Sequence, residues 1–383
     1  MNNVYLASKP RYEILDGLRG VAAILVVLFH ILETYAAGPA YQIINHGYLA
    51  VDFFFILSGF VIGYAYDDRW DKMTTWGFFK RRLVRLQPMV VMGTVVGACL
   101  YFFSQCEGFP LIGSVPGWKL LLAFVMGLLM IPCGTKMDIR GWAETNSFNG
   151  PNWSLTYEYL ANILYALILR RLPNIILAIL MAGAAFCTLD ICLNWNVFNL
   201  LTEGRNAQIY TVIGGWSLTT EQIYIGMTRL MYPFLCGLLL SRIGRFIKLK
   251  GGFWLCSLLL AALFAIPCVG GENNILNGYY NAACILILFP VIVMIGAGSS
   301  IKGEKTAKLC TFLGEISYPL YITHFPIMYV LMSWAWSHPE APVYAHVMVA
   351  AGSILLSIGL AYACLKLYDI PVRKWLTENW LKR

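Results

Sequence analysis

The chain has 383 residues, of which 59% are hydrophobic and 13% are charged, whereas soluble domains carry about 25% charged residues. This composition excludes an ordinary soluble enzyme. Nearly all of the sequence consists of apolar runs of roughly 17 to 25 residues, the length that spans a bilayer, or of short connections between such runs. We therefore expect residues 1–383 to form one all-α, polytopic membrane domain, a helical bundle with no fused soluble domain.

The net charge of +8 has a topological explanation. The basic residues gather in alternate loops, which is the pattern of the positive-inside rule, so no nucleic-acid partner is needed to account for the charge. We predict that these loops and both termini are cytoplasmic. The basic clusters cover residues 9–19, 69–85, 170–171, 242–250, 302–308 and 366–383.

The same alternation sets the number of membrane spans. Residues 118–132 are shorter than a typical span, and counting them as one would place Arg170 and Arg171 outside the cell. We predict that this segment is re-entrant or interfacial on the external side. The remaining apolar runs predict about ten spans, near residues 18–35, 47–66, 88–104, 152–169, 174–193, 223–241, 253–269, 281–297, 317–334 and 344–366.

The first span, LDGLRGVAAILVVLFH at residues 15–30, contains two ionisable groups. Arg19 and His30 are eleven residues apart, about three helical turns, so they share one helix face and lie about 16 Å apart along the axis. Because ionisable groups are costly inside a membrane, we expect both to be functional. A cleavable signal peptide, ending in the small residues of TYAAGPA, is the alternative for this segment, although Glu33 interrupts the apolar run next to that site.

Two later spans also contain polar residues at helical spacing. Ser154, Glu158 and Asn162 recur every four residues and form one polar stripe. Hydrogen bonds between helices would explain the serine and the asparagine, but a carboxylate favours a functional role. Ser317 and His324 are seven residues apart on one face, and this histidine either lines a site or is a packing residue.

The segments GYLAVDFFFILSGFVIG and FFKRRLVRLQP lie on either side of a predicted cytoplasmic loop. In the first, Asp52 either orients a catalytic group or caps its helix, and Ser58 lies midway along the span. In the second, Lys80, Arg81, Arg82 and Arg85 serve topology and lipid headgroups, or bind phosphates through their guanidinium forks. No metal site is visible in the sequence.

These motifs, together with NWSLTYEY, LGEISYPLYITHFPI and YDIPVRKWL, occur in the order seen in the membrane-bound acyltransferase family 3. The chain resembles that family from about residue 14 to 376. Members move acyl groups, typically acetyl, from coenzyme A to hydroxyls of surface glycans, antibiotics or other extracytoplasmic acceptors. Gln87 departs from the bulky residue that commonly precedes the proline. The family's signatures fall on Arg19 and His30, on Arg81, Arg82 and Arg85, on Trp153, Ser154 and Glu158, and on Ser317, Tyr318 and His324.

The resemblance implies a membrane-embedded O-acyltransferase in a bacterial cytoplasmic membrane, with acyl-CoA as donor and no metal cofactor. The phosphates of the donor would bind Arg19, the three arginines at residues 81–85, and the neighbourhood of Asp16, while an extended pantetheine arm reaches His30. We expect His30 to act as general base on the acceptor hydroxyl, oriented by Glu158 or Glu33, with a covalent acyl-histidine as the alternative.

The acceptor would be a hydroxyl of a cell-surface glycan or another extracytoplasmic molecule. Because the sequence has no room for a fused esterase-like domain, a separate extracytoplasmic protein is a possible acyl-relay partner. A transporter or flippase for glycans or lipids is the alternative function, since spans with buried charges are also typical of transporters. We see no inverted repeat to support it.

Overall fold

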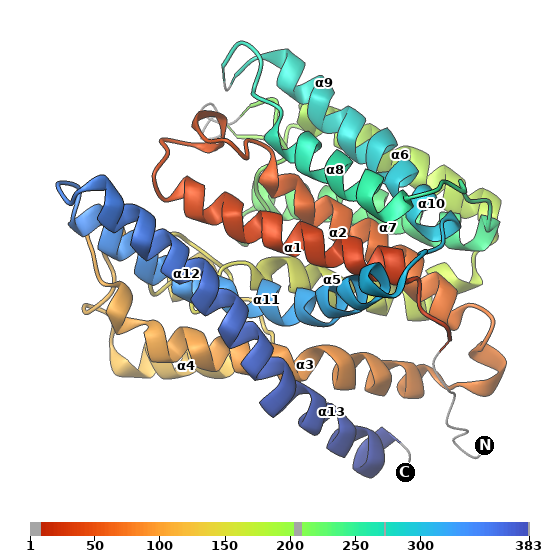
Figure 1. The fold of residues 1–383 in the computed structure, drawn as a ribbon, viewed down its shortest axis with the longest axis horizontal. Coiled ribbons are helices and arrows are strands. Elements are labelled where there is room, and N and C mark those ends of the chain that lie inside the picture. The colour runs from red at the N-terminus through yellow and green to blue at the C-terminus, as the bar shows by residue number, and fades with distance from the viewer. Residues whose placement is uncertain (1–8, 203–208, 272, 382–383) are drawn as a thin grey trace.

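The computed structural model describes residues 9–202, 209–271 and 273–381, and within these ranges it contains helices and no strand (Figure 1). The expected all-α fold is therefore confirmed. The helices are α1 (Glu13–Glu33), α2 (Ala50–Tyr66), α3 (Thr75–Leu100), α4 (Gly117–Leu128), α5 (Asn152–Leu167), α6 (Asn174–Cys192), α7 (Thr220–Ile243), α8 (Gly252–Ala265), α9 (Ile275–Ala283), α10 (Phe289–Gly298), α11 (Glu304–Ser337), α12 (Val343–Cys364) and α13 (Ile370–Leu376).

Seven helical segments among the described residues are long and apolar enough to cross a membrane. They include α9 with α10, which a π-helical turn at Cys284–Leu288 joins into one rod. The chain is thus a polytopic helical membrane protein. The predicted spans near 152–169, 253–269 and 317–334 correspond to α5, α8 and α11. These three helices are too short or not apolar enough to be counted among the seven, so the total of ten spans stays a prediction.

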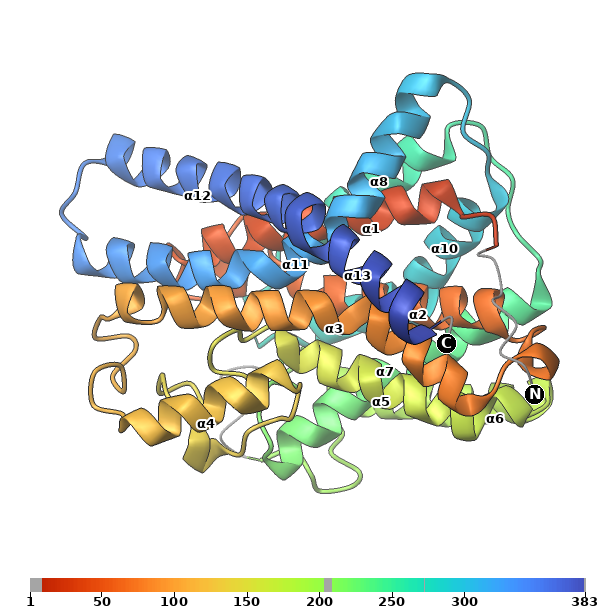
Figure 2. The same cartoon turned by 90° about the horizontal axis from the view of Figure 1, so that it is seen from below.

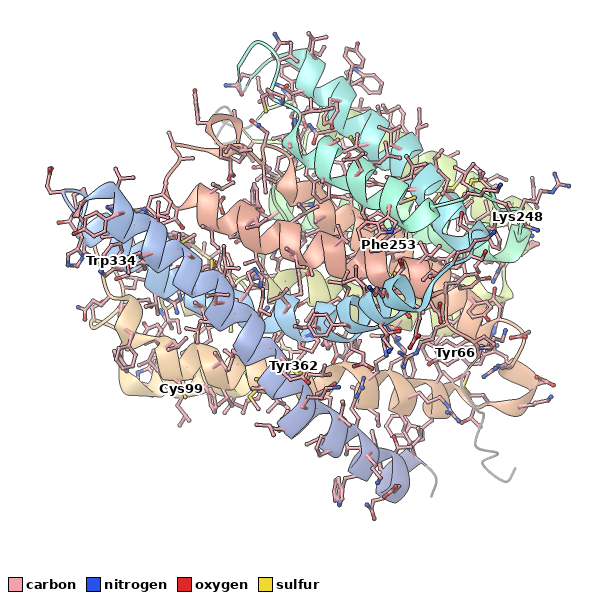
Figure 3. The ribbon with its side chains drawn as sticks, in the orientation of Figure 1. Tyr66, Cys99, Lys248, Phe253, Trp334 and Tyr362 are labelled. Atoms are coloured by element: carbon pink, nitrogen blue, oxygen red, sulfur yellow. The ribbon has the colours of Figure 1, made fainter. Side chains whose placement is uncertain are left out.

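The basic loops meet at one end of the bundle. Arg242, at the end of α7, donates to the Asp67 carboxylate after α2 (2.6 Å) and to the Leu172 carbonyl after α5 (2.8 Å). Figure 1 places both ends of the described chain there, and Figure 3 shows Tyr66 and Lys248 at that end and Trp334 at the opposite one. The grouping agrees with the charge alternation; that this end is cytoplasmic remains a prediction.

Helix α4 has the dimensions of a re-entrant segment. It has 12 residues, lies beside the second half of α3 in Figure 2, and ends where the Leu128 carbonyl accepts a hydrogen bond from Gln87 (2.6 Å). Gln87 lies midway along α3, so the chain turns back there instead of running the length of the bundle. The expected short helix is therefore present; that it is re-entrant or interfacial on the external side stays a prediction.

Close packing of α1 against α11 positions the first group of site residues. A side chain at Gly20 would place its Cβ 2.4 Å from the Leu313 carbonyl oxygen, and one at Gly314 would lie 2.8 Å from Asp16. Small residues let helix backbones approach this closely in membrane proteins. The glycines therefore bring the start of α1 into direct contact with α11, next to Arg19.

The last helix is longer than its predicted span at 344–366. After α12 the chain forms a π-helical turn at Leu365–Asp369, continues as α13, and ends in a second π-helical turn at Thr377–Leu381. Pro371 accounts for the first turn, because proline lacks an N–H and clashes with the carbonyl four residues earlier. The continuation places the C-terminal segment against α3, where Lys80 donates to the Trp380 carbonyl (3.2 Å).

Candidate active site

Arg19 is fixed by contacts on both sides. Its Nε donates to the Ser317 hydroxyl (2.8 Å), its Nη2 donates to the Gly314 carbonyl (3.0 Å), and Nη2 also lies 3.2 Å from the Asp16 carboxylate. Three predicted site residues from α1 and α11 are thus brought together. The role of Ser317 at this point is to hold the guanidinium in place.

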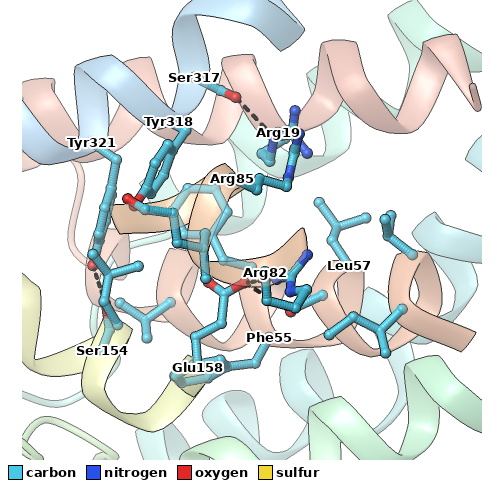
Figure 4. Close-up of a pocket in the computed structure, with 17 residues that line it drawn as sticks. Arg19, Phe55, Leu57, Arg82, Arg85, Ser154, Glu158, Ser317, Tyr318 and Tyr321 are labelled. Carbon is cyan, nitrogen blue, oxygen red and sulfur yellow. Dashed lines mark hydrogen bonds and ion pairs between the residues drawn. The ribbon is translucent and has the colours of Figure 1, made fainter. Parts of the chain in front are cut away.

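A second group joins α2, α3 and α5. The Glu158 carboxylate accepts from Arg82 Nη2 (2.8 Å) and from the Ser58 hydroxyl (3.3 Å), as Figure 4 shows for the arginine. Arg82 Nε is buried and has no hydrogen-bond partner among the residues that the structure describes. The three residues of the polar stripe on α5 have different roles. Glu158 and Ser154 line a pocket, whereas the Asn162 amide donates to the Glu158 backbone carbonyl of its own helix.

Two connected cavities run between these groups. The outer cavity opens at the end where the basic loops meet, and the inner pocket shown in Figure 4 lies deeper between α2, α3, α5 and α11. The two cavities share Arg19, Val61, Arg82, Arg85 and Tyr318. The predicted phosphate-binding arginines therefore stand at the junction of an open vestibule with a narrow, more apolar pocket, and Arg81 lines the vestibule.

Arg85 differs from the neighbouring arginines in the contacts of its guanidinium group. It is exposed to the cavity and makes no hydrogen bond or ion pair with any residue in the described ranges. Arg19, Arg82 and Arg373 lie within electrostatic range of Arg85 and outnumber the carboxylates in the same range, those of Asp16 and Asp369, so the charge around Arg85 is net positive. The arrangement can therefore bind an anionic ligand through an unpaired guanidinium.

The inner pocket ends at an aromatic barrier. The Tyr321 hydroxyl is hydrogen-bonded to the Ser154 hydroxyl (2.8 Å) and to the Pro151 carbonyl (3.4 Å), and the Phe54 ring lies 5.4 Å from the Tyr321 ring. Nearby, the Tyr318 hydroxyl donates to the Leu86 carbonyl (2.8 Å). Ser154 and Tyr318 are thus both at the pocket, where they hold α5 and α3 against α11.

The two intramembrane histidines form a pair beyond this barrier. The His30 and His324 rings stack with centroids 5.6 Å apart, and the Tyr321 ring lies 6.0 Å from that of His324. Neither histidine is among the residues that line the two cavities. In this arrangement the aromatic barrier separates the histidines from the arginines, a feature that helical spacing alone does not predict.

The hydrogen bonds assign a tautomer to each ring. His30 Nδ1 lies 2.8 Å from the Glu33 carboxylate, and His324 Nδ1 lies 3.0 and 2.9 Å from the Leu320 and Tyr321 carbonyls. Because these partners are acceptors, each Nδ1 carries the proton, which leaves Nε2 of each ring free to accept one. His324 Nε2 is buried and has no partner. Of the two carboxylates expected to orient His30, Glu33 makes the contact, and Glu158 contacts Arg82 and Ser58 instead.

Asp52 neither caps α2 nor lines the cavities. The helix has no side-chain cap, and the Asp52 carboxylate pairs with Arg229 of α7 (2.7 Å) in a sealed interior. Arg229 also donates to the Tyr48 and Gly214 carbonyls, and its guanidinium lies 5.3 Å from the Trp153 ring. Trp153 therefore packs on this ion pair and does not line the pocket. Sequence reasoning missed Arg229, although an arginine within the predicted span at 223–241 was a sufficient signal.

A further buried polar group was missed in the loop before α5. The Glu144 carboxylate accepts from the Tyr329 hydroxyl (2.8 and 2.7 Å), and the Arg140 guanidinium lies 3.7 Å from the Tyr329 ring centroid. Burial raises the pKa of Glu144 to about 7, and the Asp138 charge adds to this rise against the opposing effects of Tyr329 and Arg140. No periodic pattern in the sequence marks this loop.

In the described ranges, no group of three or more His, Cys, Asp or Glu side chains is arranged to hold a metal ion. The site consists of arginines around a cavity, a carboxylate that pairs with one of them, and a histidine pair behind an aromatic barrier. Fold and site together define a helical membrane protein with a charged cavity that leads toward two histidines.

The chain belongs to the membrane-bound acyltransferase family 3, since that family's acyltransferase domain matches residues 12–365. It is 25% identical to acyltransferase MdmB of Streptomyces mycarofaciens, over 83% of this chain and 79% of that protein. It is 24% identical to O-acetyltransferase OatA of Staphylococcus aureus, over 95% of this chain but 58% of the relative. A third relative, protein 2 in the picA locus of Rhizobium radiobacter, is 36% identical over 41% of this chain and 81% of that protein. No solved structure matches the chain.

Proposed function

We propose that this membrane acyltransferase takes an acyl group, acetyl in the simplest case, from acyl-CoA on the cytoplasmic side and transfers it to a hydroxyl outside the membrane. The acceptor is a cell-surface glycan or another extracytoplasmic molecule. The observation that carries the proposal is the unpaired Arg85 guanidinium at the junction of the two cavities, flanked by Arg19 and Arg82. Both termini and the cavity mouth then face the cytoplasm of a bacterial cell.

The shape of the cavities matches the order of groups in the donor. Phosphates carry the negative charge of coenzyme A, and arginine binds them through bidentate, charge-assisted hydrogen bonds. The pantetheine arm is long and nearly neutral, which suits the inner pocket with its apolar side chains Phe54, Leu57 and Val61. The arm points the thioester at Tyr321 and, beyond it, at the histidine pair. A turn of the Tyr321 side chain would open this path.

In the transfer step, His30 acts as the base. Its Nδ1 proton is held by Glu33, so Nε2 accepts the proton of the acceptor hydroxyl as the oxygen attacks the thioester carbonyl. The carbon–sulfur bond then breaks, and the thiolate of coenzyme A takes the proton back from the imidazolium. In the covalent variant, His30 Nε2 attacks first and the acceptor hydroxyl later displaces the histidine. Radiolabelled acyl trapped on the protein without acceptor would distinguish this route.

The relatives support the choice of a hydroxyl acceptor and leave its identity open. One relative bears the name O-acetyltransferase, and this chain spans 58% of its length. An acceptor hydroxyl outside the membrane would approach His30 from the Glu33 end of α1, where the Glu33 side chain is 34% exposed, or a separate extracytoplasmic protein would relay the acyl group onward. Either route starts from the same half-reaction at the arginines and His30.

The test is binding of coenzyme A to the purified protein in detergent, measured by isothermal titration calorimetry, with Arg85→Gln compared with Arg171→Gln. Arg171 is an exposed arginine at the same end and lines neither cavity. We expect Arg85→Gln to weaken binding and Arg171→Gln to leave it unchanged. Wild-type protein that does not bind coenzyme A would contradict the proposal and favour a transporter, whose substrate transport would need no thioester.

A further inference from the structure

The C-terminal helix forms one wall of the arginine-lined cavity. Asp369, Arg373 and Lys374, which belong to the motif YDIPVRKWL, line the outer cavity opposite the arginines of α3. Figures 1 and 2 both place α13 alongside the first part of α3, and the Lys80 ammonium lies 5.3 Å from the Trp380 ring. A π-helical turn immediately precedes α13, and such turns are frequent at functional sites.

Asp369 fixes the guanidinium of Arg373. Asp369 is 2% exposed, and its Oδ2 forms an ion pair with Arg373 Nε at 3.2 Å. Its Oδ1 is buried and has no hydrogen-bond partner in the described part of the chain, so one acceptor of this carboxylate is left open there. The two terminal nitrogens of Arg373 have no partner among the described residues, and the side chain, which lines the outer cavity, is 33% exposed. A guanidinium group that is held at Nε and has both terminal nitrogens available is suited to bind an oxyanion.

The position of Arg373 differs from that of the junction arginines. Arg19, Arg82 and Arg85 line both cavities, whereas Arg373 lines only the outer one and lies within electrostatic range of Arg85. The unpaired guanidinium of Arg85 and the exposed end of the Arg373 guanidinium carry like charges, and an anion between them relieves their repulsion. A ligand with two separated phosphate groups would satisfy both.

We propose that Arg373 binds the terminal 3′-phosphate of coenzyme A, while the junction arginines bind its pyrophosphate. This assignment rests on the proposed function. It follows from the order of groups in the donor: when the thioester points into the inner pocket, the pyrophosphate reaches the junction first and the ribose 3′-phosphate lies farther out. The C-terminal helix is then a binding element of the enzyme, held against α3 by the ligand as well as by Lys80.

The experiment compares coenzyme A with dephospho-coenzyme A, which lacks only the 3′-phosphate, by titration calorimetry on full-length protein in detergent. We expect wild-type protein to prefer coenzyme A, and Arg373→Gln to lose about tenfold in affinity for coenzyme A with unchanged affinity for the dephospho form. Arg85→Gln should weaken both ligands. The matched control is Arg171→Gln, the same change at an exposed arginine at this end of the bundle that lines neither cavity.

Monodisperse elution and an unchanged melting temperature establish that Arg373→Gln is folded, and Arg373→Lys should restore part of the preference because it restores the charge without the fork. Arg373→Gln protein that keeps the wild-type preference for coenzyme A would overturn the inference, as would equal weakening of both ligands. Wild-type protein that binds neither ligand would instead overturn the proposed function, so the two failures are distinguishable.

Discussion

Two arginine–carboxylate pairs inside the bundle show how differently buried charges can be used. Arg229 and Asp52 have side chains that are 3% and 0% exposed, and the guanidinium donates to the carboxylate and to two backbone carbonyls. Arg82 and Glu158 are 8% and 20% exposed, line the cavity, and leave Arg82 Nε without a partner. The first pair is complete within the protein, whereas the second is open to a ligand. Burial of a charge alone therefore does not identify an active site.

The largest effect is expected when the arginine is removed from the fully buried Arg229–Asp52 pair. Arg229→Gln should lower the free energy of unfolding by about 3–5 kcal/mol, because it leaves the Asp52 carboxylate buried and unpaired. Thermal unfolding of the purified protein measures the loss. Replacing both residues by leucine or methionine should recover much of it, and a single variant as stable as wild type would contradict a structural role for the pair.

Glu144 is a third buried carboxylate, and unlike Asp52 and Glu158 it contacts a neutral hydroxyl, that of Tyr329. Burial raises its pKa to about 7, above the value of about 4.5 for an unfolded glutamate, so the folded state binds the proton more tightly. Stability should therefore be greatest below about pH 4.5, fall as pH rises from there to about 7, and level off above. The fall is roughly 3 kcal/mol at most.

The measurement for Glu144 is thermal unfolding across this pH range, with Glu144→Gln as the comparison. The variant should have a flatter profile, because glutamine does not titrate. Asp138, Arg140 and Tyr329 remain in place in both proteins and provide a common background. Identical profiles for the two proteins would show that Glu144 does not govern this pH dependence.

A substitution in the Arg82–Glu158 pair should weaken ligand binding more than it lowers the stability of the protein. Arg82→Gln removes one of the junction guanidinium groups, so we expect coenzyme A to bind roughly 10- to 100-fold more weakly. The unfolding free energy should change by about 1 kcal/mol, because Glu158 keeps the Ser58 hydroxyl and access to cavity water. A destabilisation as large as that of Arg229→Gln would remove the distinction between the pairs.

The smallest effect is expected at the half-exposed carboxylate next to His30. Glu33→Gln keeps the side-chain shape but weakens the hold on Nδ1, so turnover of acyl-CoA should fall about fivefold, within the range measured for exposed ion pairs. Binding of coenzyme A should not change. Glu158→Gln provides the contrast: if it, and not Glu33→Gln, impaired turnover with intact donor binding, the orienting role would belong to Glu158.

The sequence was sufficient for features that follow from helical periodicity and charge alternation. The 3.6-residue repeat placed Ser154 and Glu158 on one face, and both line the pocket. The length of residues 118–132 indicated a helix shorter than a membrane span, and α4 has 12 residues. These inferences succeed because they depend on one helix at a time or on a rule about loops.

Contacts between helices could not be derived in the same way. Spacing within a single helix does not show whether Glu158 faces His30 or Arg82, because that depends on how α5 is rotated against α1 and α3. The aromatic barrier at Tyr321 has the same origin, since it requires Phe54 and Ser154 from two other helices. The charge pair at Arg229 was accessible in principle, because an arginine within a predicted span demands a partner.

The most direct test of the central claim is release of free coenzyme A from acetyl-CoA by purified protein, with wild type compared with His30→Ala. With water in place of the acceptor hydroxyl, we predict release by wild type that falls at least about 100-fold in His30→Ala, because general-base catalysis contributes at least this much. Both proteins should bind coenzyme A equally, since His30 lines neither cavity. Equal release by the two proteins would contradict the assignment of His30 as the base, and the absence of both binding and release in wild type would contradict coenzyme A as the donor.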